Sequence, residues 1–226
     1  FSNFYFADKI RPTVTSLAAS RSAKERLLNS LDDPRGFNSA TKERTQLVKQ
    51  LTDENPTPKA GSTDGFAPFA LGTWRIVYAP HIYTMGSLIG GSFDPVHYIM
   101  KQDGVMTSHA RYSLPLIGSG WLSVSGTYGS DDENMVCRVD FDKAWVSLVN
   151  QSSGSDGIID DDSPIPSFEA VPDSFSKNLI QVIGQLGFVK SVSVFPVSYL
   201  DDDTIVFDFE LLGTRICARK IDDPEH

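Results

Sequence analysis

The sequence has only two cysteines, Cys137 and Cys217, among its 226 residues. One disulfide is possible, but two cysteines cannot build a disulfide scaffold, and two buried free thiols are the simpler expectation. No apolar run approaches the roughly 20 residues that a membrane-spanning helix needs. Basic residues are also scarce: 20 Lys and Arg against 29 Asp and Glu give a net charge of −9, which would repel a phosphate backbone. We expect a soluble or peripheral protein that does not bind nucleic acid.

Motifs for catalysis and metal binding are missing as well. The four histidines lack the spacing of a metalloprotease, and no C-x-x-C pair occurs, so no metal site is expected. The acidic triplets at 160–162 and 201–203 lack the alternating ligands of a calcium loop and are predicted to be solvated turns. The run 86–91 lacks the ending of a phosphate loop, and there is no G-x-S-x-G elbow. We do not expect an enzyme, although catalysis on a lipid inside the fold remains an alternative.

The N-terminal part of the chain has helical periodicity. Residues 22–31 and 40–53 are predicted as helices because leucine and valine side chains recur on one stripe of each. Ser39 is a candidate N-cap of the second helix. Pro56 ends that helix, because the residue before a proline is driven out of the α region. Residues 21–58 are therefore expected to form a helical segment.

From residue 71 onward the apolar period changes from 3.6 to 2. Trp74, Ile76 and Tyr78 alternate with less apolar neighbours, as in a strand with one buried face. Seven further runs have a strand-like composition, at about 96–102, 105–113, 120–128, 134–149, 189–198, 204–211 and 214–220. About eight antiparallel strands favour closure, because a closed sheet has no exposed edges. We therefore predict a mainly β fold, with an antiparallel barrel over residues 71–220 behind a helical pair.

Two insertions interrupt this pattern. Residues 83–91 are apolar and rich in glycine, which predicts a mobile loop at the barrel mouth. Residues 151–173 form a polar, acidic loop that is long for a compact domain. A short helix at 174–186 follows that loop and is placed to cover one end of the barrel.

Residues 1–20 form an aromatic leader. It contains Phe1, Phe4, Tyr5 and Phe6, which either pack back onto the domain or anchor the chain to another protein or a membrane interface. We favour the anchor. The sequence begins with Phe1 and not Met, and shows no secretory signal, so we expect that a targeting segment has been removed.

The stretch Asn55-Pro56-Thr57-Pro58, followed by Gly72-Thr73-Trp74-Arg75-Ile76-Val77-Tyr78, resembles the plastid lipid-associated protein family, also called fibrillins. Weaker similarities at 24–28, 35–36, 40–44, 199–204 and 215–220 extend the resemblance over about residues 20–220. The resemblance implies a lipocalin-like barrel in a plastid such as the chloroplast, at thylakoids or plastoglobules. It also implies a bound lipid, isoprenoid, carotenoid, chlorophyll or quinone. Two departures concern the ligand: Ile205-Val206-Phe207 stands where the family commonly has an arginine, and loop 151–173 is not typical.

Alternation along the strands predicts which side chains would line a ligand site. The predicted lining consists of Trp74, Ile76, Tyr78, Trp121, Phe141, Phe207 and Phe209. The resemblance further implies that Trp74 closes the barrel base beneath an arginine of the last strand, Arg215 or Arg219. The same side chains could instead simply fill the interior.

We predict the first of two functions and keep the second as the alternative. One is a non-catalytic protein that binds a lipid, isoprenoid or pigment. The other is a structural, extrinsic subunit with no ligand in its barrel, docked to a photosystem or light-harvesting complex. A barrel interior filled solidly by side chains would favour the structural subunit.

Overall fold

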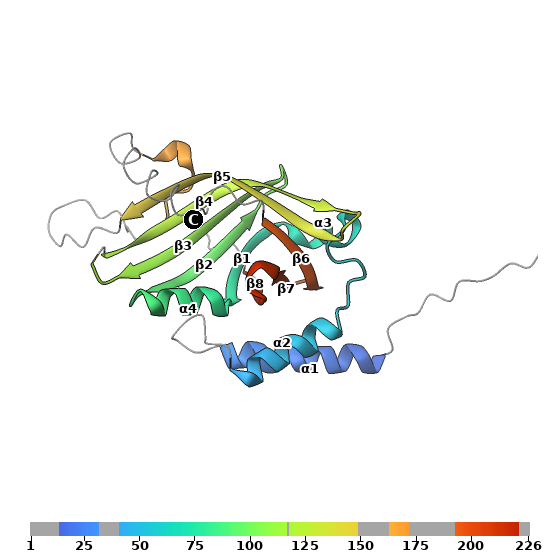
Figure 1. Cartoon of the computed structure of the whole chain (residues 1–226). Helices are drawn as coiled ribbons and strands as arrows, with labels where there is room; N and C mark the ends of the chain where they lie inside the picture. Colours follow the sequence, from blue (N-terminus) through green and yellow to red (C-terminus); the bar gives the residue numbers. More distant parts are fainter. Residues whose placement is uncertain (1–13, 32–40, 117, 149–162, 172–192, 222–226) are drawn as a thin grey trace, which may run out of the picture.

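The fold is a closed antiparallel barrel, in agreement with the predicted class. The computed structural model describes residues 14–31, 41–116, 118–148, 163–171 and 193–221. Each strand pairs with the next one in the chain, and the last pairs with the first (Figure 1). The strands are β1 (Gly72–Tyr78), β2 (Ser92–Met100), β3 (Val105–Leu114), β4 (Gly118–Asp131), β5 (Val136–Leu148), β6 (Ser193–Leu200), β7 (Thr204–Phe209) and β8 (Thr214–Ile221).

The described helices differ from the predicted ones in number and in bounds. They are α1 (Val14–Leu31), α2 (Lys42–Asp53), α3 (Thr63–Ala70) and α4 (Pro80–Leu88), with two 3₁₀ turns, η1 (Phe168–Ala170) and η2 (Glu210–Leu212). The first helix begins inside the expected leader 1–20. The cap of α2 is Thr41 and not Ser39, since the Thr41 side chain accepts a hydrogen bond from the Arg44 amide at 3.1 Å. The stretch 83–91, predicted to be a mobile loop, lies mostly in α4.

The helical pair packs on the outside of the barrel, as Figure 1 shows beneath the C-terminal strands. Leu27 of α1 and Leu47 and Leu51 of α2 are buried in one cluster. The barrel contributes the outward-facing side chains of Tyr78, Tyr199, Val206 and Cys217 to that cluster. Lys24 adds polar contacts, because its ammonium pairs with the carboxylates of Asp201 and Asp203.

The Asn-Pro-Thr-Pro stretch connects the end of α2 to the barrel wall. Asn55 Oδ1 accepts hydrogen bonds from the amides of Leu200 and Thr57, at 3.1 and 3.2 Å. The Thr57 hydroxyl donates to the Leu200 carbonyl oxygen. The stretch on which the resemblance depends therefore has a structural role in this chain: it ends a helix and joins it to β6.

The base of the barrel is the end where β1 begins and β8 ends, and α3 closes it. Trp74 is fully buried there and donates from its indole nitrogen to the Ala70 carbonyl oxygen at 2.8 Å. The cation over its ring is Lys220, whose Nζ lies 5.3 Å from the ring centroid and donates to the Phe69 carbonyl oxygen.

The predicted arginine over Trp74 is wrong, because successive side chains of a strand point to opposite faces. Lys220 is the direct partner of Trp74 across the β1–β8 pair, so the two side chains share the inner face. Arg215 and Arg219 have the opposite parity. Arg219 is exposed, and Arg215 donates to the Asp208 carboxylate at 2.8 Å.

Candidate functional site

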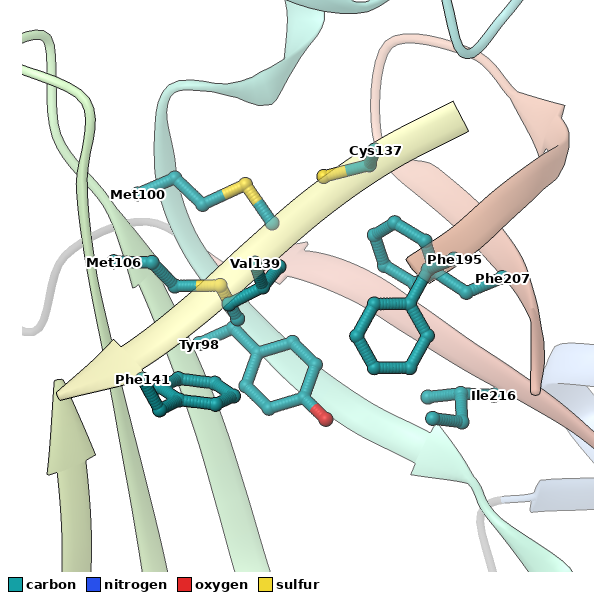
Figure 2. A pocket seen from close by; sticks show the side chains of 9 residues that line it. All are labelled: Tyr98, Met100, Met106, Cys137, Val139, Phe141, Phe195, Phe207 and Ile216. Carbon is teal, nitrogen blue, oxygen red and sulfur yellow. The ribbon is translucent and has the colours of Figure 1, made fainter. Parts of the chain in front are cut away.

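The barrel interior is the first candidate site, and side chains nearly fill it. They leave a cavity of about 20 Å³. That volume suits about one water molecule, whereas small-molecule sites usually measure roughly 300–1,000 Å³. Figure 2 shows the lining, which consists of Tyr98, Met100, Met106, Cys137, Val139, Phe141, Phe195, Phe207 and Ile216.

The chemistry of this lining is apolar, aromatic and sulfur-rich. Its polar groups are the Tyr98 hydroxyl and the Cys137 thiol, and burial raises the pKa of each to about 12. Both groups are therefore neutral at physiological pH and provide neither a general base nor a thiolate nucleophile. What the cavity offers a ligand is dispersion contacts and one phenol hydroxyl.

Five of the seven predicted lining residues do lie inside the barrel. Phe141 and Phe207 line the cavity itself. Trp74 and Ile76 belong to the same interior cluster but lie away from the cavity, and Phe209 packs against that cluster with its ring 5.9 Å from that of Phe195.

The other two predicted lining residues face away from the interior. On β1 the register shifts between Ile76 and Tyr78, so Tyr78 pairs with Cys217 and packs under the helical pair. A β-bulge adds one residue to a strand, so side chains after it point to the opposite face from the one that strict alternation predicts.

Trp121 also points outward. Its neighbour Leu122 pairs with Ala110, and Ala110 packs on the interior cluster, so Trp121 belongs to the opposite face of β4. There its ring stacks on the His97 ring, with centroids 6.4 Å apart. Predicting Trp121 as a lining residue was wrong because the choice ignored the alternation of Leu122 and Val124.

Several lining residues were missing from the prediction. The alternation of Cys137, Val139 and Phe141 along β5 already indicated one shared face. The inward residues of β2 and β3, such as Tyr98 and Met106, could be found only from cross-strand register. That register is set by turns and bulges rather than by composition.

A second candidate site lies on the outer face of β3, β4 and β5. His109 Nδ1 lies 2.8 Å from Ser123 Oγ, and both side chains are buried. Burial, with the nearby positive charges, lowers the pKa of His109 to about 4, so the ring is neutral at physiological pH. Trp145 packs edge-on against His109 and donates to the Ile165 carbonyl oxygen at 2.9 Å, which places residues 163–171 over this cluster.

A serine beside a histidine suggests a nucleophile and its base, but Ser123 has no accessible surface. A nucleophile needs an approach path for its substrate. The pair therefore acts as a satisfied buried hydrogen bond, the usual condition of polar groups inside proteins. Among the described residues there is also no cluster of three or more His, Cys, Asp or Glu side chains that could hold a metal ion.

Three predicted features fall outside the described residues. They are the docking aromatics Phe1, Phe4, Tyr5 and Phe6, the helix at 174–186, and most of loop 151–173. The two cysteines are described: both are free and buried, Cys137 inside the barrel and Cys217 beneath the helical pair. No helix in the described part of the chain is both long and apolar enough to cross a bilayer.

Comparisons of the sequence with known proteins complete these findings. No family model matches the chain. No curated protein matches it either.

Proposed function

We propose that this chain is a non-catalytic structural subunit whose barrel works as a rigid scaffold. The observation that carries this proposal is the filled interior, since a cavity of about 20 Å³ leaves no room for a lipid or pigment. The interior cluster is continuous from Trp74 and Phe66 at the base to Phe207 and Phe195. Dense packing of this kind resists deformation and suits a part that holds its shape.

The resemblance to fibrillins supports a place for this scaffold in the plastid, at the thylakoid and bound to a photosystem or light-harvesting complex. The aromatic residues Phe1, Phe4, Tyr5 and Phe6 are the proposed anchor. Deletion of residues 1–10, followed by co-purification with thylakoid complexes, tests that anchor. Unchanged association of the shortened chain would remove it.

The second candidate function is a carrier of one hydrophobic molecule. The apolar lining favours it, because Met100 and Met106 are unbranched and can adopt other rotamers around a guest. A carrier would have to enlarge the cavity of about 20 Å³ more than tenfold, to a volume on the order of 300 Å³ or above. The packed state is therefore better suited to the scaffold.

One binding experiment separates the two functions. The wild-type chain is titrated with toluene, hexadecanoic acid, β-carotene and a plastoquinone analogue, and saturable binding is measured. Phe207→Ala serves as the matched positive control, because removal of a buried ring leaves a dry cavity that accepts a small aromatic molecule. We expect toluene to bind the variant and no compound to bind the wild type. Saturable binding of one long-chain molecule per wild-type barrel would establish the carrier and overturn the scaffold.

A further inference from the structure

Most of the exposed large apolar side chains of the described residues lie at one end of the barrel, and Leu71 at the base is the exception. The end opposite the base carries α4 and the turn between β3 and β4 (Figure 1). Leu116 in that turn is 99% exposed, and Leu88 at the end of α4 is 81% exposed. We call these two residues, together with Tyr83, Met85 and Ile89, the apolar tip. All five are exposed to solvent.

The two parts of the apolar tip are neighbours in space. Ser92, just after α4, pairs with Ser113 at the end of β3. Gly90 has a φ of +70° and turns the chain so closely that a Cβ there would lie 3.7 Å from Pro115 Cγ. The end of α4 and the β3–β4 turn therefore form one protruding surface.

The segments that form the apolar tip carry no charge. Residues 80–92 and 113–122 contain no Asp, Glu, Lys or Arg, although the chain carries a net charge of −9. Two of the turns at the base are acidic: β4–β5, at the end of β4, contains 131–133 and β6–β7 contains 201–203, whereas β2–β3 balances Asp103 with Lys101. The β7–β8 turn at the same end as the apolar tip contains Glu210, so the uncharged surface is confined to α4 and the β3–β4 turn.

We propose that the apolar tip inserts into the surface of a lipid bilayer whose headgroups carry no net charge. This inference deepens the proposed function, on which it rests for the presence of a membrane near the scaffold. Transfer of an exposed apolar side chain from water into the apolar region of a bilayer is favourable in free energy. An anionic surface would need basic residues at the tip, and its sequence has none.

A lipid surface fits the apolar tip better than a protein partner does. Leucine is under-represented among the residues that dominate protein interfaces, where Trp, Tyr and Arg in fitted pockets prevail. Leu116 and Leu88 protrude, so a protein would need two matched pockets, whereas fluid acyl chains adapt to any convex shape. The acidic base then points into water, where its carboxylates stay solvated.

Site-specific fluorescence tests the proposal with the full chain. Both native cysteines are buried, so Leu116→Cys and Leu88→Cys each provide one accessible thiol for an environment-sensitive dye. Leu71→Cys is the matched control, a leucine 41% exposed at the base. With phosphatidylcholine vesicles we expect a blue shift at positions 116 and 88 and none at position 71. No shift at either tip position, or an equal shift at all three, would overturn the proposal.

Sedimentation with the same vesicles measures how much the apolar tip contributes. Leu116→Asp and Leu88→Asp should each weaken vesicle binding about tenfold, because each places a carboxylate where the wild type inserts an aliphatic side chain into the bilayer. Leu71→Asp should leave binding unchanged. Tighter binding to phosphatidylglycerol vesicles than to phosphatidylcholine would contradict the neutral headgroup.

The two proposals fail in different ways. Absent vesicle binding with a barrel that takes no ligand refutes the tip alone. Saturable ligand binding with intact vesicle binding refutes the scaffold alone.

Discussion

Trp74 shows at the scale of one residue how the barrel is closed. Its indole N–H donates to α3, and the Lys220 ammonium covers its ring while donating to the same helix. A buried indole needs a partner for its polar edge, and this residue has one on α3. The base is thus held by one aromatic ring and one cation that are direct neighbours across β1 and β8.

Lys220→Met should lower the free energy of unfolding by about 1–2 kcal/mol. The variant keeps an aliphatic stem but loses the cation over the ring and the bond to Phe69. Arg219→Met is the matched control: Arg219 is next in sequence and exposed, so its change should stay within about 0.5 kcal/mol. Urea unfolding followed by tryptophan fluorescence compares the two. Equal losses would contradict a special role for Lys220.

The lowered pKa of His109 predicts how the stability of the fold depends on pH. Its pKa is lowered to about 4 in the folded chain, so between about pH 6.5 and 4 the unfolded state binds the extra proton. The free energy of unfolding is therefore unaffected by His109 above about pH 6.5. It falls by up to about 3 kcal/mol as the pH is lowered from there to about 4. Burial also lowers the pKa of His97 and His81, which add to the same trend.

The variant His109→Gln isolates that residue, because glutamine can still bond with Ser123 but does not titrate. Urea unfolding at pH 7.5 and at pH 5 should show a smaller loss of stability for the variant than for the wild type. Identical losses in the two proteins would show that His109 is not the group responsible.

The strands and helices show what the sequence could predict at the scale of elements. Strand-like composition, with clear period-2 alternation in several runs, predicted a strand near each of the eight that the structure describes. The side chain that each strand turns inward was harder to predict, since the bulge after Ile76 reverses the parity of β1. Helix α3 was missed because it is short and contains glycine and proline, although Ser62 gives a cap signal.

Leu27→Ala should loosen the helical pair without opening the barrel. Leu27 is fully buried against the outer wall, and such a truncation usually costs about 2–5 kcal/mol. Cys217 lies under the helices and Cys137 inside the barrel, so their labelling rates report on the two parts separately. We expect Cys217 to react about tenfold faster or more in the variant, with Cys137 unchanged.

Mass spectrometry of the labelled peptides distinguishes the two thiols. Glu25→Ala is the control, because that side chain on α1 is exposed. Equal acceleration at both cysteines would mean that helices and barrel open as a single unit.

At the scale of the whole molecule, the barrel has a filled interior, acidic turns at its base and an uncharged apolar tip on α4 and the β3–β4 turn. Of the residues predicted to line a ligand site, Phe141 and Phe207 line the cavity, and each shares a face with regularly alternating neighbours. Cavity size could not be predicted, because it depends on how side chains from eight strands interdigitate. The sequence favoured the carrier and gave the scaffold as the alternative, whereas the packing of the interior favours the scaffold.

Native mass spectrometry of the protein isolated from its natural source tests that central claim most directly. A barrel filled by its own side chains predicts the mass of the chain alone, with no hydrophobic adduct that organic extraction removes. One lipid, quinone or pigment molecule per chain, retained through purification and released by extraction, would contradict the scaffold.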